Sequence, residues 1–195
     1  MVVRAEAMVR VVSVDVNAGT GFANALRRSL IADVASWAPS SVKFGVNQSI
    51  ANDEFLSHRI GQIPFRRISD ACEQIGTIDV VGPTRVTMHH FSSLAFEPVH
   101  KNIELIHLGP EERLQMTVSF DRGCATRHGR YMSVAAVGMT QTRPGVHVLR
   151  FEPHDEQIDP RVVLEEALTA LEARVDRALL GLVDQDGTSR KVSFC

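Results

Sequence analysis

The sequence has few of the residues that mark secreted, membrane-spanning or metal-binding proteins. Its 195 residues include 3 cysteines, which are far apart and form no CxxC pair: Cys72, Cys124 and Cys195. An odd number of scattered cysteines favours free thiols in a reducing compartment over disulfides or a cysteine-rich zinc site. No apolar run approaches the ~18 residues that span a bilayer, and Arg4, Glu6 and Arg10 interrupt the N-terminal segment where a signal peptide is apolar. We therefore expect an intracellular protein.

Neither sign of charge is in excess. The chain has 21 Lys and Arg residues against 23 Asp and Glu residues, for a formal net charge of -2. This balance argues against a surface that is itself a footprint for nucleic acid, so any basic patch must be local. The length of 195 residues suffices for one domain, or for one domain with a smaller one inserted into it.

Signatures of catalysis and metal binding are also missing. The sequence has no GxSxG motif and no P-loop, and none of its 8 histidines forms HxxxH or HExxH. His89 and His90 are adjacent, so in a strand they would point to opposite faces. Asp53 and Glu54 fit the first turn of a helix better than an acid and base pair, because nothing nearby supplies an electrophile. The residues therefore predict no metal, no cofactor and no catalytic group.

Hydrophobic periodicity predicts alternating strands and helices over the first 65 residues. A strand over residues 9–16 precedes a helix from about residue 20 to 34, for which Thr20 is the candidate N-cap. The apolar stripe of this helix is Phe22, Leu26, Leu30 and Val34. A second strand alternates at 42–46, and Asn52 caps a short helix over about 53–61 that ends before Pro64.

From about residue 66 to residue 144 the helical period disappears, and short strand-like segments follow one another. The change of periodicity predicts an α+β fold in which residues 1–65 and 145–195 form one domain. A β-rich domain at 66–144 is inserted into it. Asp159 and Pro160 then begin a final helix that extends to about residue 183.

The final helix carries an apolar seam with spacings of four and three residues, a pattern that packs on a partner helix. The seam is Leu164, Leu168, Leu171, Val175, Ala178 and Leu182. The alternative is that the helix packs on the sheet of its own domain, and a helix this apolar can serve both roles.

A strand, a Gly19-x-Gly21 turn and a helix also begin a nucleotide-phosphate fingerprint. Asn24 stands at the third glycine position, no acidic residue ends the second strand, and no further βα units follow. The same helix carries the adjacent Arg27 and Arg28. Because neighbouring helical positions are about 100° apart, one arginine can face solvent while the other flanks the apolar stripe and contacts another protein.

Residues 22–65 contain three linked motifs. They are NALRR at 24–28, Asn47 after a strand, and DEFLSHRIGQIP at 53–64. Together they resemble the signature of the assembly subunits of multisubunit RNA polymerases. This family comprises the bacterial alpha N-terminal domain, its archaeal counterpart and the eukaryotic third-largest subunit. The match extends through Gly61, Ile63 and Pro64.

Weaker motifs extend the resemblance over nearly the whole chain. HLGPEERLQMTV and RHGRYMSVAA resemble later segments of the family, and the final helix corresponds to its dimerisation helix. Two features depart from the pattern. Pro110 follows Gly109, and Cys72 and Cys124 stand alone where many archaeal and eukaryotic members carry clustered cysteines, so no metal is implied. The compact length suggests a reduced member of the family, cellular or viral.

The resemblance implies a dimerisation domain like the polymerase alpha N-terminal domain, interrupted by the β-rich insertion. It implies a non-catalytic subunit that pairs with a smaller subunit of the same fold and nucleates assembly of the two large catalytic subunits. DNA and RNA would be contacted through the complex, with no membrane, in the nucleus or cytoplasm, or in a virion for a viral member. The implied docking residues for the large subunits are Asn24, Arg27, Arg28, Asp53, Glu54, His58 and Arg59. Expected dimerisation residues are Phe22, Leu26, Leu30, Leu164, Leu168, Leu171, Val175 and Leu182.

Two other interpretations stay open at this point. One is a nucleotide-binding enzyme that uses the turn between Gly19 and Gly21. The other is a self-pairing adaptor unrelated to transcription, held together by its final helix.

Overall fold

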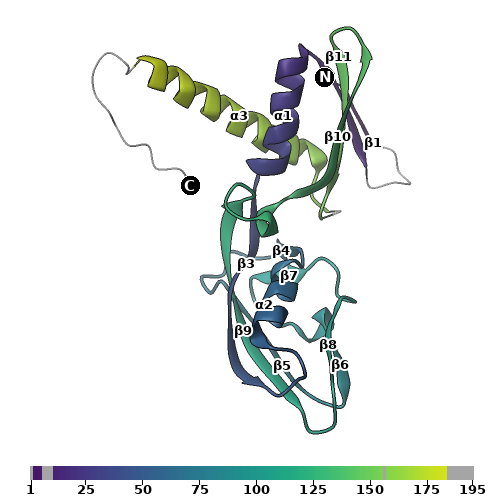
Figure 1. Cartoon of the computed structure of the whole chain (residues 1–195), viewed down its shortest axis with the longest axis vertical. Coiled ribbons are helices and arrows are strands. Elements are labelled where there is room, and N and C mark those ends of the chain that lie inside the picture. The colour runs from purple at the N-terminus through teal and green to yellow at the C-terminus, as the bar shows by residue number, and fades with distance from the viewer. Residues whose placement is uncertain (1, 6–10, 156, 184–195) are drawn as a thin grey trace. The chain divides into compact units, whose positions relative to one another are not determined.

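The computed structural model describes residues 2–5, 11–155 and 157–183 of the chain (Figure 1). This part of the chain is mixed α+β, with small β-sheets and three α-helices. It divides into two compact units. Unit 1 comprises the described residues within Met1–Ser36 and Cys124–Cys195, and unit 2 comprises Trp37–Gly123.

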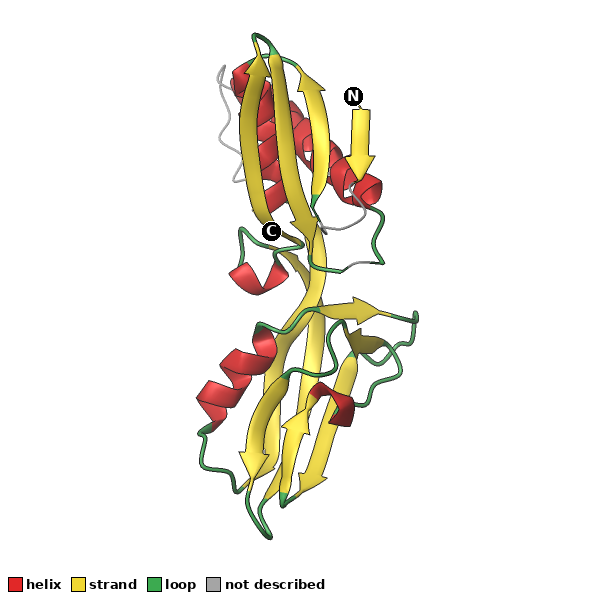
Figure 2. Ribbon diagram, turned by 90° about the vertical axis from the view of Figure 1, so that its right-hand side faces the viewer, coloured by secondary structure: helices red, strands yellow, loops and turns green. Residues whose placement is uncertain are grey.

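Unit 1 is built on a four-stranded antiparallel sheet in the order β1-β2-β11-β10. Its strands are β1 (Val2–Ala5), β2 (Val12–Asn17), β10 (Val134–Arg143) and β11 (Val146–Pro153). Two helices, α1 (Thr20–Ala32) and α3 (Pro160–Val183), lie on one face of this sheet (Figure 2). A short 3-10 helix, η2, spans Gly129–Tyr131.

The core of unit 1 lies between the sheet and the two helices. Alternate residues of β2 point inward, so that Val12, Val14 and Val16 are buried. They pack with apolar residues from both helices and from β11: Leu26, Leu30, Leu149, Phe151, Val163, Leu164 and Ala167. A buried hydrogen bond also joins the helices, since Ser29 Oγ donates to the Ala167 carbonyl oxygen at 2.8 Å.

The start of α1 differs from the expectation. Gly19 is the N-cap residue, and Thr20 is the first residue of the helix with no capping hydrogen bond. The hydroxyl of Thr20 instead lies 3.1 Å from Nε2 of His147, a buried residue of β11. Thr20 therefore joins the helix to the sheet, a contact between distant residues that the local sequence does not encode.

Unit 2 consists of three small sheets, one helix and a 3-10 helix. The sheets have the strand orders β3-β9-β5, β4-β7 and β6-β8. The strands are β3 (Ala35–Asn47), β4 (Phe65–Arg67), β5 (Ile75–Val81), β6 (Thr84–Thr87), β7 (Phe96–Pro98), β8 (Glu104–Leu108) and β9 (Arg113–Cys124). The helix α2 spans Asp53–Gly61, and the 3-10 helix η1 spans Met88–His90.

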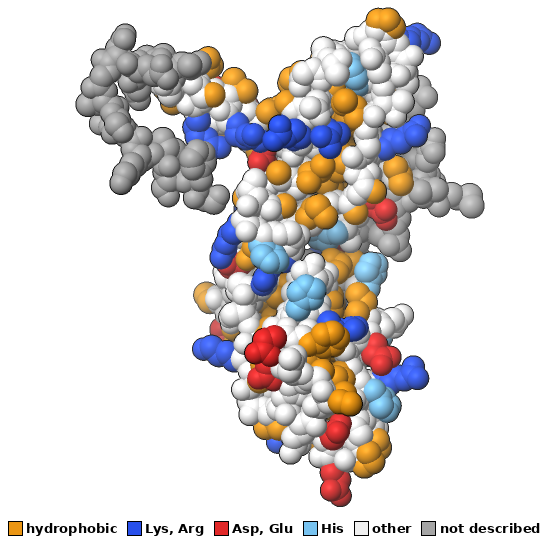
Figure 3. Space-filling view, in the orientation of Figure 1, with side chains coloured by type: hydrophobic (Ala, Val, Ile, Leu, Met, Phe, Trp, Pro, Cys, Tyr) orange, Lys and Arg blue, Asp and Glu red, His pale blue; other side chains and the backbone are white. Residues whose placement is uncertain are grey.

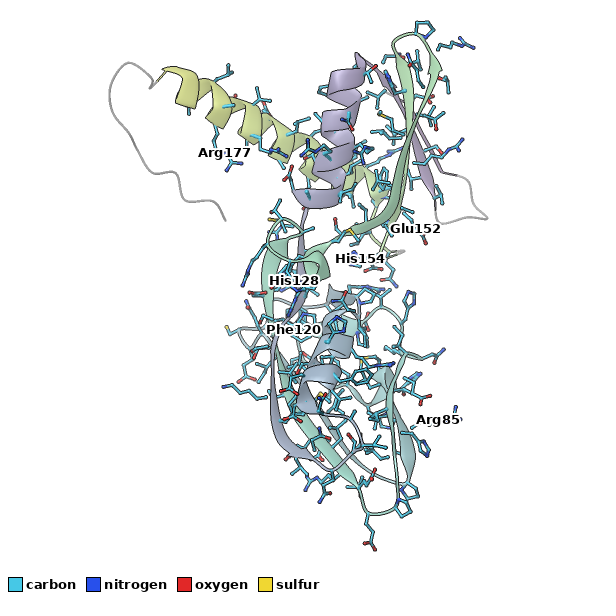
Figure 4. All side chains as sticks on the ribbon, in the orientation of Figure 1. Arg85, Phe120, His128, Glu152, His154 and Arg177 are labelled. Atoms are coloured by element: carbon cyan, nitrogen blue, oxygen red, sulfur yellow. The ribbon has the colours of Figure 1, made fainter. Side chains whose placement is uncertain are left out.

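The core of unit 2 is rich in aromatic rings. Phe120, labelled in Figure 4, stacks on Phe96 with ring centroids 4.2 Å apart and meets Phe65 edge-on at 4.9 Å. The ring centroids of Trp37 and Phe96 are 5.4 Å apart, and those of Phe91 and Phe65 are 5.0 Å apart. These rings fill the space between the β3-β9-β5 sheet, β4 and β7. Offset and edge-to-face pairs of this kind stabilise a fold beyond their burial alone.

The two units do not follow the boundaries near residues 65 and 145 that periodicity suggested. Most of β3, together with α2, packs in unit 2, whereas β10 pairs with β11 in the unit 1 sheet, for example Met139 opposite Leu149. Strands β10 and β11 form an antiparallel hairpin, and its turn contains Gly145, which has a positive φ of 77°. The division into a dimerisation domain and an inserted domain stays a prediction about function.

Candidate functional site

The exposed side of α1 carries the NALRR residues. Arg27 donates from Nε and Nη2 to Oδ1 of Asn24, at 3.1 and 3.0 Å, as residues three apart on a helix can. Arg28 is exposed and Arg27 half-buried, whereas Leu26 and Leu30 face the core. One face of α1 therefore packs inward, and Asn24, Arg27 and Arg28 lie on the other.

A groove between α1 and α3 brings these arginines together with two more. We call it the arginine groove. Its volume is about 1010 Å³, and its lining residues are Arg27, Arg28, Ile31, Ala32, Asp33, Cys124, Thr126, Ala170, Ala173, Arg174, Arg177 and Ala178. Figure 3 shows Lys and Arg side chains (blue) as a band across this part of unit 1. Arg177 projects from α3 (Figure 4) and donates through Nε to the Ala173 carbonyl oxygen at 3.1 Å. Arg174 Nη1 lies 2.6 Å from Oδ2 of Asp33.

A second, apolar groove lies along the same two helices. We call it the apolar groove. Its volume is about 440 Å³, and its lining residues are Phe22, Ala25, Leu168, Thr169, Leu171, Glu172, Val175 and Asp176. Phe22 is 47% exposed and Val175 is 51% exposed, although both are large apolar side chains. Further along α3, Leu179 and Leu180 are also exposed. Exposed clusters of large apolar side chains are typical of interaction surfaces.

The expected dimerisation residues fall into three groups. Leu26, Leu30 and Leu164 are buried in the core of unit 1, so they support the helices from inside rather than offering a surface. Leu168 and Leu171 are partly buried, and Phe22 and Val175 are exposed, and these four line the apolar groove. Leu182 lies in α3, but its side chain is outside the described residues. The first half of the final helix packs inward and its second half is exposed, so packing on its own domain is observed and pairing through the exposed half stays a prediction.

The other expected docking residues lie on α2. Asn52 caps this helix as expected, because its side chain accepts a hydrogen bond from the Phe55 backbone N–H at 2.9 Å. Asn47 donates from Nδ2 to Oδ1 of Asp53 at 2.7 Å and to the Ala51 carbonyl oxygen at 3.0 Å. The spacing between Asn47 and the helix motif thus has a local cause, since Asn47 fixes the entry to α2.

The outer face of α2 is polar and open. Asp53, Glu54, His58 and Arg59 are all on the part of the helix that is not buried. Arg59 donates from Nη2 to the Glu104 carbonyl oxygen at 2.6 Å, and its guanidinium lies 5.7 Å from the centre of the Phe55 ring. The expected docking residues thus lie in two groups, one on α1 in unit 1 and one on α2 in unit 2.

Sequence reasoning missed two features. Arg174 and Arg177 are three residues apart on α3, and the signal that could have found them is this spacing, which places both on one helix face. The other is an exposed ion pair in unit 2, where Arg113 donates to Asp79 at 2.9 and 2.7 Å. The hydrogen bonds from Arg113 lower the pKa of Asp79 below its ordinary value, and the carboxylate raises the pKa of Arg113.

Within the described ranges, no group of three His, Cys, Asp or Glu side chains is placed to hold a metal ion. Cys72 and Cys124 are both free thiols. No helix in the described part of the chain has the length and apolar character needed to cross a membrane. At Gly19 and Gly21 an added Cβ would meet open space, so packing does not require glycine at either position.

Comparison with known proteins finds relatives among the subunits of DNA-directed RNA polymerases. The chain is 28% identical over 168 residues to DNA-directed RNA polymerase subunit Rpo3 of Methanocaldococcus jannaschii. This alignment covers 84% of this chain and 87% of that protein. It is 30% identical over 158 residues to subunit Rpo3 of Halobacterium salinarum, covering 77% of this chain and 63% of the relative. A segment of 51 residues is 45% identical to subunit RPAC1 of RNA polymerases I and III of Saccharomyces cerevisiae, covering 26% of this chain and 15% of RPAC1. No family model matches the chain.

Arginine-lined and apolar helix surfaces of this kind are typical of proteins that bind other proteins. Within that class, the chain is similar over most of its length to subunit 3 of DNA-directed RNA polymerases. It spans most of the Methanocaldococcus relative but less than two thirds of the Halobacterium relative.

Proposed function

We propose that this chain is a non-catalytic assembly subunit of a DNA-dependent RNA polymerase. It pairs with a smaller subunit of the same dimerisation fold, and the pair nucleates assembly of the two large catalytic subunits. The observation that carries this proposal is the similarity to subunit 3 of archaeal and eukaryotic polymerases, combined with helix surfaces in unit 1 that are left uncovered. Nucleotidyl transfer would belong to the large subunits, and DNA and RNA would be contacted through the complex.

The apolar groove is the proposed site of pairing. Leu168, Leu171 and Val175 follow one another at spacings of three and four residues, which suits packing against a helix of the partner. Phe22 from α1 adds an aromatic ring to the same surface. Covering these side chains would remove apolar area from water, the dominant source of free energy in most associations.

The polar residues of α1 and α2 are the proposed docking sites for the large subunits. Arg27 and Arg28 offer planar guanidinium groups suited to bidentate contacts with carboxylates. Asp53, Glu54, His58 and Arg59 offer charges of both signs on one helix. We also propose that unit 2 contains the inserted domain of the resemblance, with no separate function assigned to it.

A polymerase subunit acts inside the cell, in the nucleus or cytoplasm according to the source. The relatives named above come from archaea and yeast, and none of them supports a location in a virion. The nucleotide-binding interpretation has no observation in its favour beyond the two glycines.

The test is affinity purification of the full chain from its native source, followed by mass spectrometry. We expect two very large proteins and one small protein in equal amounts with the chain. A self-pairing adaptor would bring down only its own copies, and a nucleotide-binding enzyme would elute alone and bind ATP or a dinucleotide. Either result would overturn the proposal.

A further inference from the structure

The arginine groove has far more positive than negative charge. Four arginines line it, and Asp33 is the one carboxylate among its lining residues. Asp33 is already engaged by Arg174 at 2.6 Å. Arg27 is hydrogen-bonded to the neutral amide of Asn24, and Arg177 to a backbone carbonyl. Among the ion pairs of the described residues, none involves Arg27, Arg28 or Arg177.

Between the arginines the groove is lined by small apolar side chains. Ala170, Ala173 and Ala178 come from α3, and Ile31 and Ala32 come from α1. Alanines allow another backbone to approach a helix closely, and the arginines beside them can then reach its side chains. This combination suits a peptide segment in which acidic residues alternate with small apolar ones. A groove for nucleic acid would follow the phosphate backbone and offer aromatic side chains for stacking, and no aromatic residue lines this one.

We propose that the arginine groove receives an acidic segment of one large polymerase subunit, and that Arg174 and Arg177 of α3 bind its carboxylates together with Arg27 and Arg28. The inference rests on the proposed function and adds to it the chemistry of the docking partner and two residues. Arginine is suited to this role, because its planar guanidinium binds a carboxylate through two parallel hydrogen bonds. Arg28 also lines a smaller pocket with Leu171 and Val175, so the arginine groove continues into the surface proposed for pairing.

The first experiment identifies the occupant. A photo-crosslinking amino acid replaces Thr126, a lining residue of the groove, in the full chain within the intact polymerase. After irradiation, mass spectrometry identifies the crosslinked peptide. We expect a peptide of a large subunit with several Asp or Glu residues within about ten positions of the crosslink. A crosslink to the smaller subunit, to nucleic acid or to a segment without acidic residues overturns the inference.

The second experiment measures the arginines. We compare the double variant Arg174→Glu with Arg177→Glu against a control that reverses two exposed arginines of the β10–β11 hairpin, Arg143→Glu with Arg150→Glu. Both variants change the net charge equally. We expect recovery of the large subunit to fall at least about tenfold for the α3 variant, as for loss of paired charges at an interface, and less than about twofold for the control.

Two further measurements keep this result interpretable. If Glu beside Asp33 disturbs folding, seen as a changed circular dichroism spectrum, Arg174→Gln with Arg177→Gln removes the charges without repulsion and should give the same loss. If the α3 variant and the control recover the large subunit equally well, the inference is overturned. The proposed function then still stands, because the polymerase copurifies with the chain. Failure of the proposed function looks different, because wild-type chain would then recover no large subunit at all.

Discussion

Placing charge in the apolar groove should weaken pairing with the smaller subunit without destabilising the fold of the chain. The double variant Phe22→Asp with Val175→Asp changes two apolar side chains that are 47% and 51% exposed in the chain by itself. Full burial of such a side chain is worth ~1.5–3 kcal/mol, so covering the exposed half of each contributes roughly 0.8–1.5 kcal/mol, or about 1.5–3 kcal/mol for the pair. Since about 1.4 kcal/mol is tenfold in affinity, pairing should weaken at least about tenfold. Burying the two new carboxylates would weaken it further.

The assay is copurification of the smaller subunit with each variant, together with thermal unfolding of the chain alone. The matched control is Val162→Asp, because Val162 is 48% exposed on the same helix but lies outside the apolar groove. We expect the double variant to lose the smaller subunit and to keep its unfolding temperature, and the control to keep both. Full pairing of the double variant at micromolar concentration would refute the assignment of this groove.

Three further predictions concern other parts of the chain. Replacing Arg27 and Arg28 by Ala should leave pairing and helix stability near normal while recovery of the large subunits falls sharply in moderate salt; unchanged recovery would contradict a docking role. Gly76→Ala would place a Cβ 2.1 Å from a packed phenylalanine ring and should cost ~1–3 kcal/mol in chemical denaturation, whereas Gly138→Ala, with open space around it, should not. The lowered pKa of Asp79 means that its ion pair stabilises the fold above the ordinary pKa of 3.8 and loses this effect as pH falls through the lowered value. Asp79→Asn should therefore lower the unfolding temperature more at pH 7 than at pH 2, and an equal deficit at both pH values would contradict this account.

The sequence predicted the elements that depend on local signals. The helix at 53–61 has its cap at Asn52 as expected, and the final helix begins at Pro160, where an Asp-Pro pair announces it. In β9, Leu114 and Met116 alternate with polar residues, the pattern of a strand with one buried face, and both are buried. Helix caps, proline positions and a hydrophobic period of two depend only on neighbouring residues. They can therefore be recognised in the sequence without knowledge of the tertiary structure.

Features that depend on distant contacts were not predictable in the same way. The strand-like segments between residues 66 and 144 did not indicate that β10 would join the sheet of unit 1, because strand pairing depends on residues far away in the sequence. Thr20 contacts His147, 127 positions further on. The grouping of Arg27 and Arg28 with Arg174 and Arg177 likewise requires the crossing of α1 and α3, which no local pattern specifies.

The most direct test of an assembly role is reconstitution of the polymerase from purified subunits with and without this chain. The two large subunits are mixed with the smaller subunit alone, or with the smaller subunit and the full chain, and the products are measured by light scattering after gel filtration. Our account predicts that the large subunits form one complex containing all four proteins when the chain is present, and stay apart when it is omitted. Assembly of the two large subunits to the same extent without the chain would contradict it.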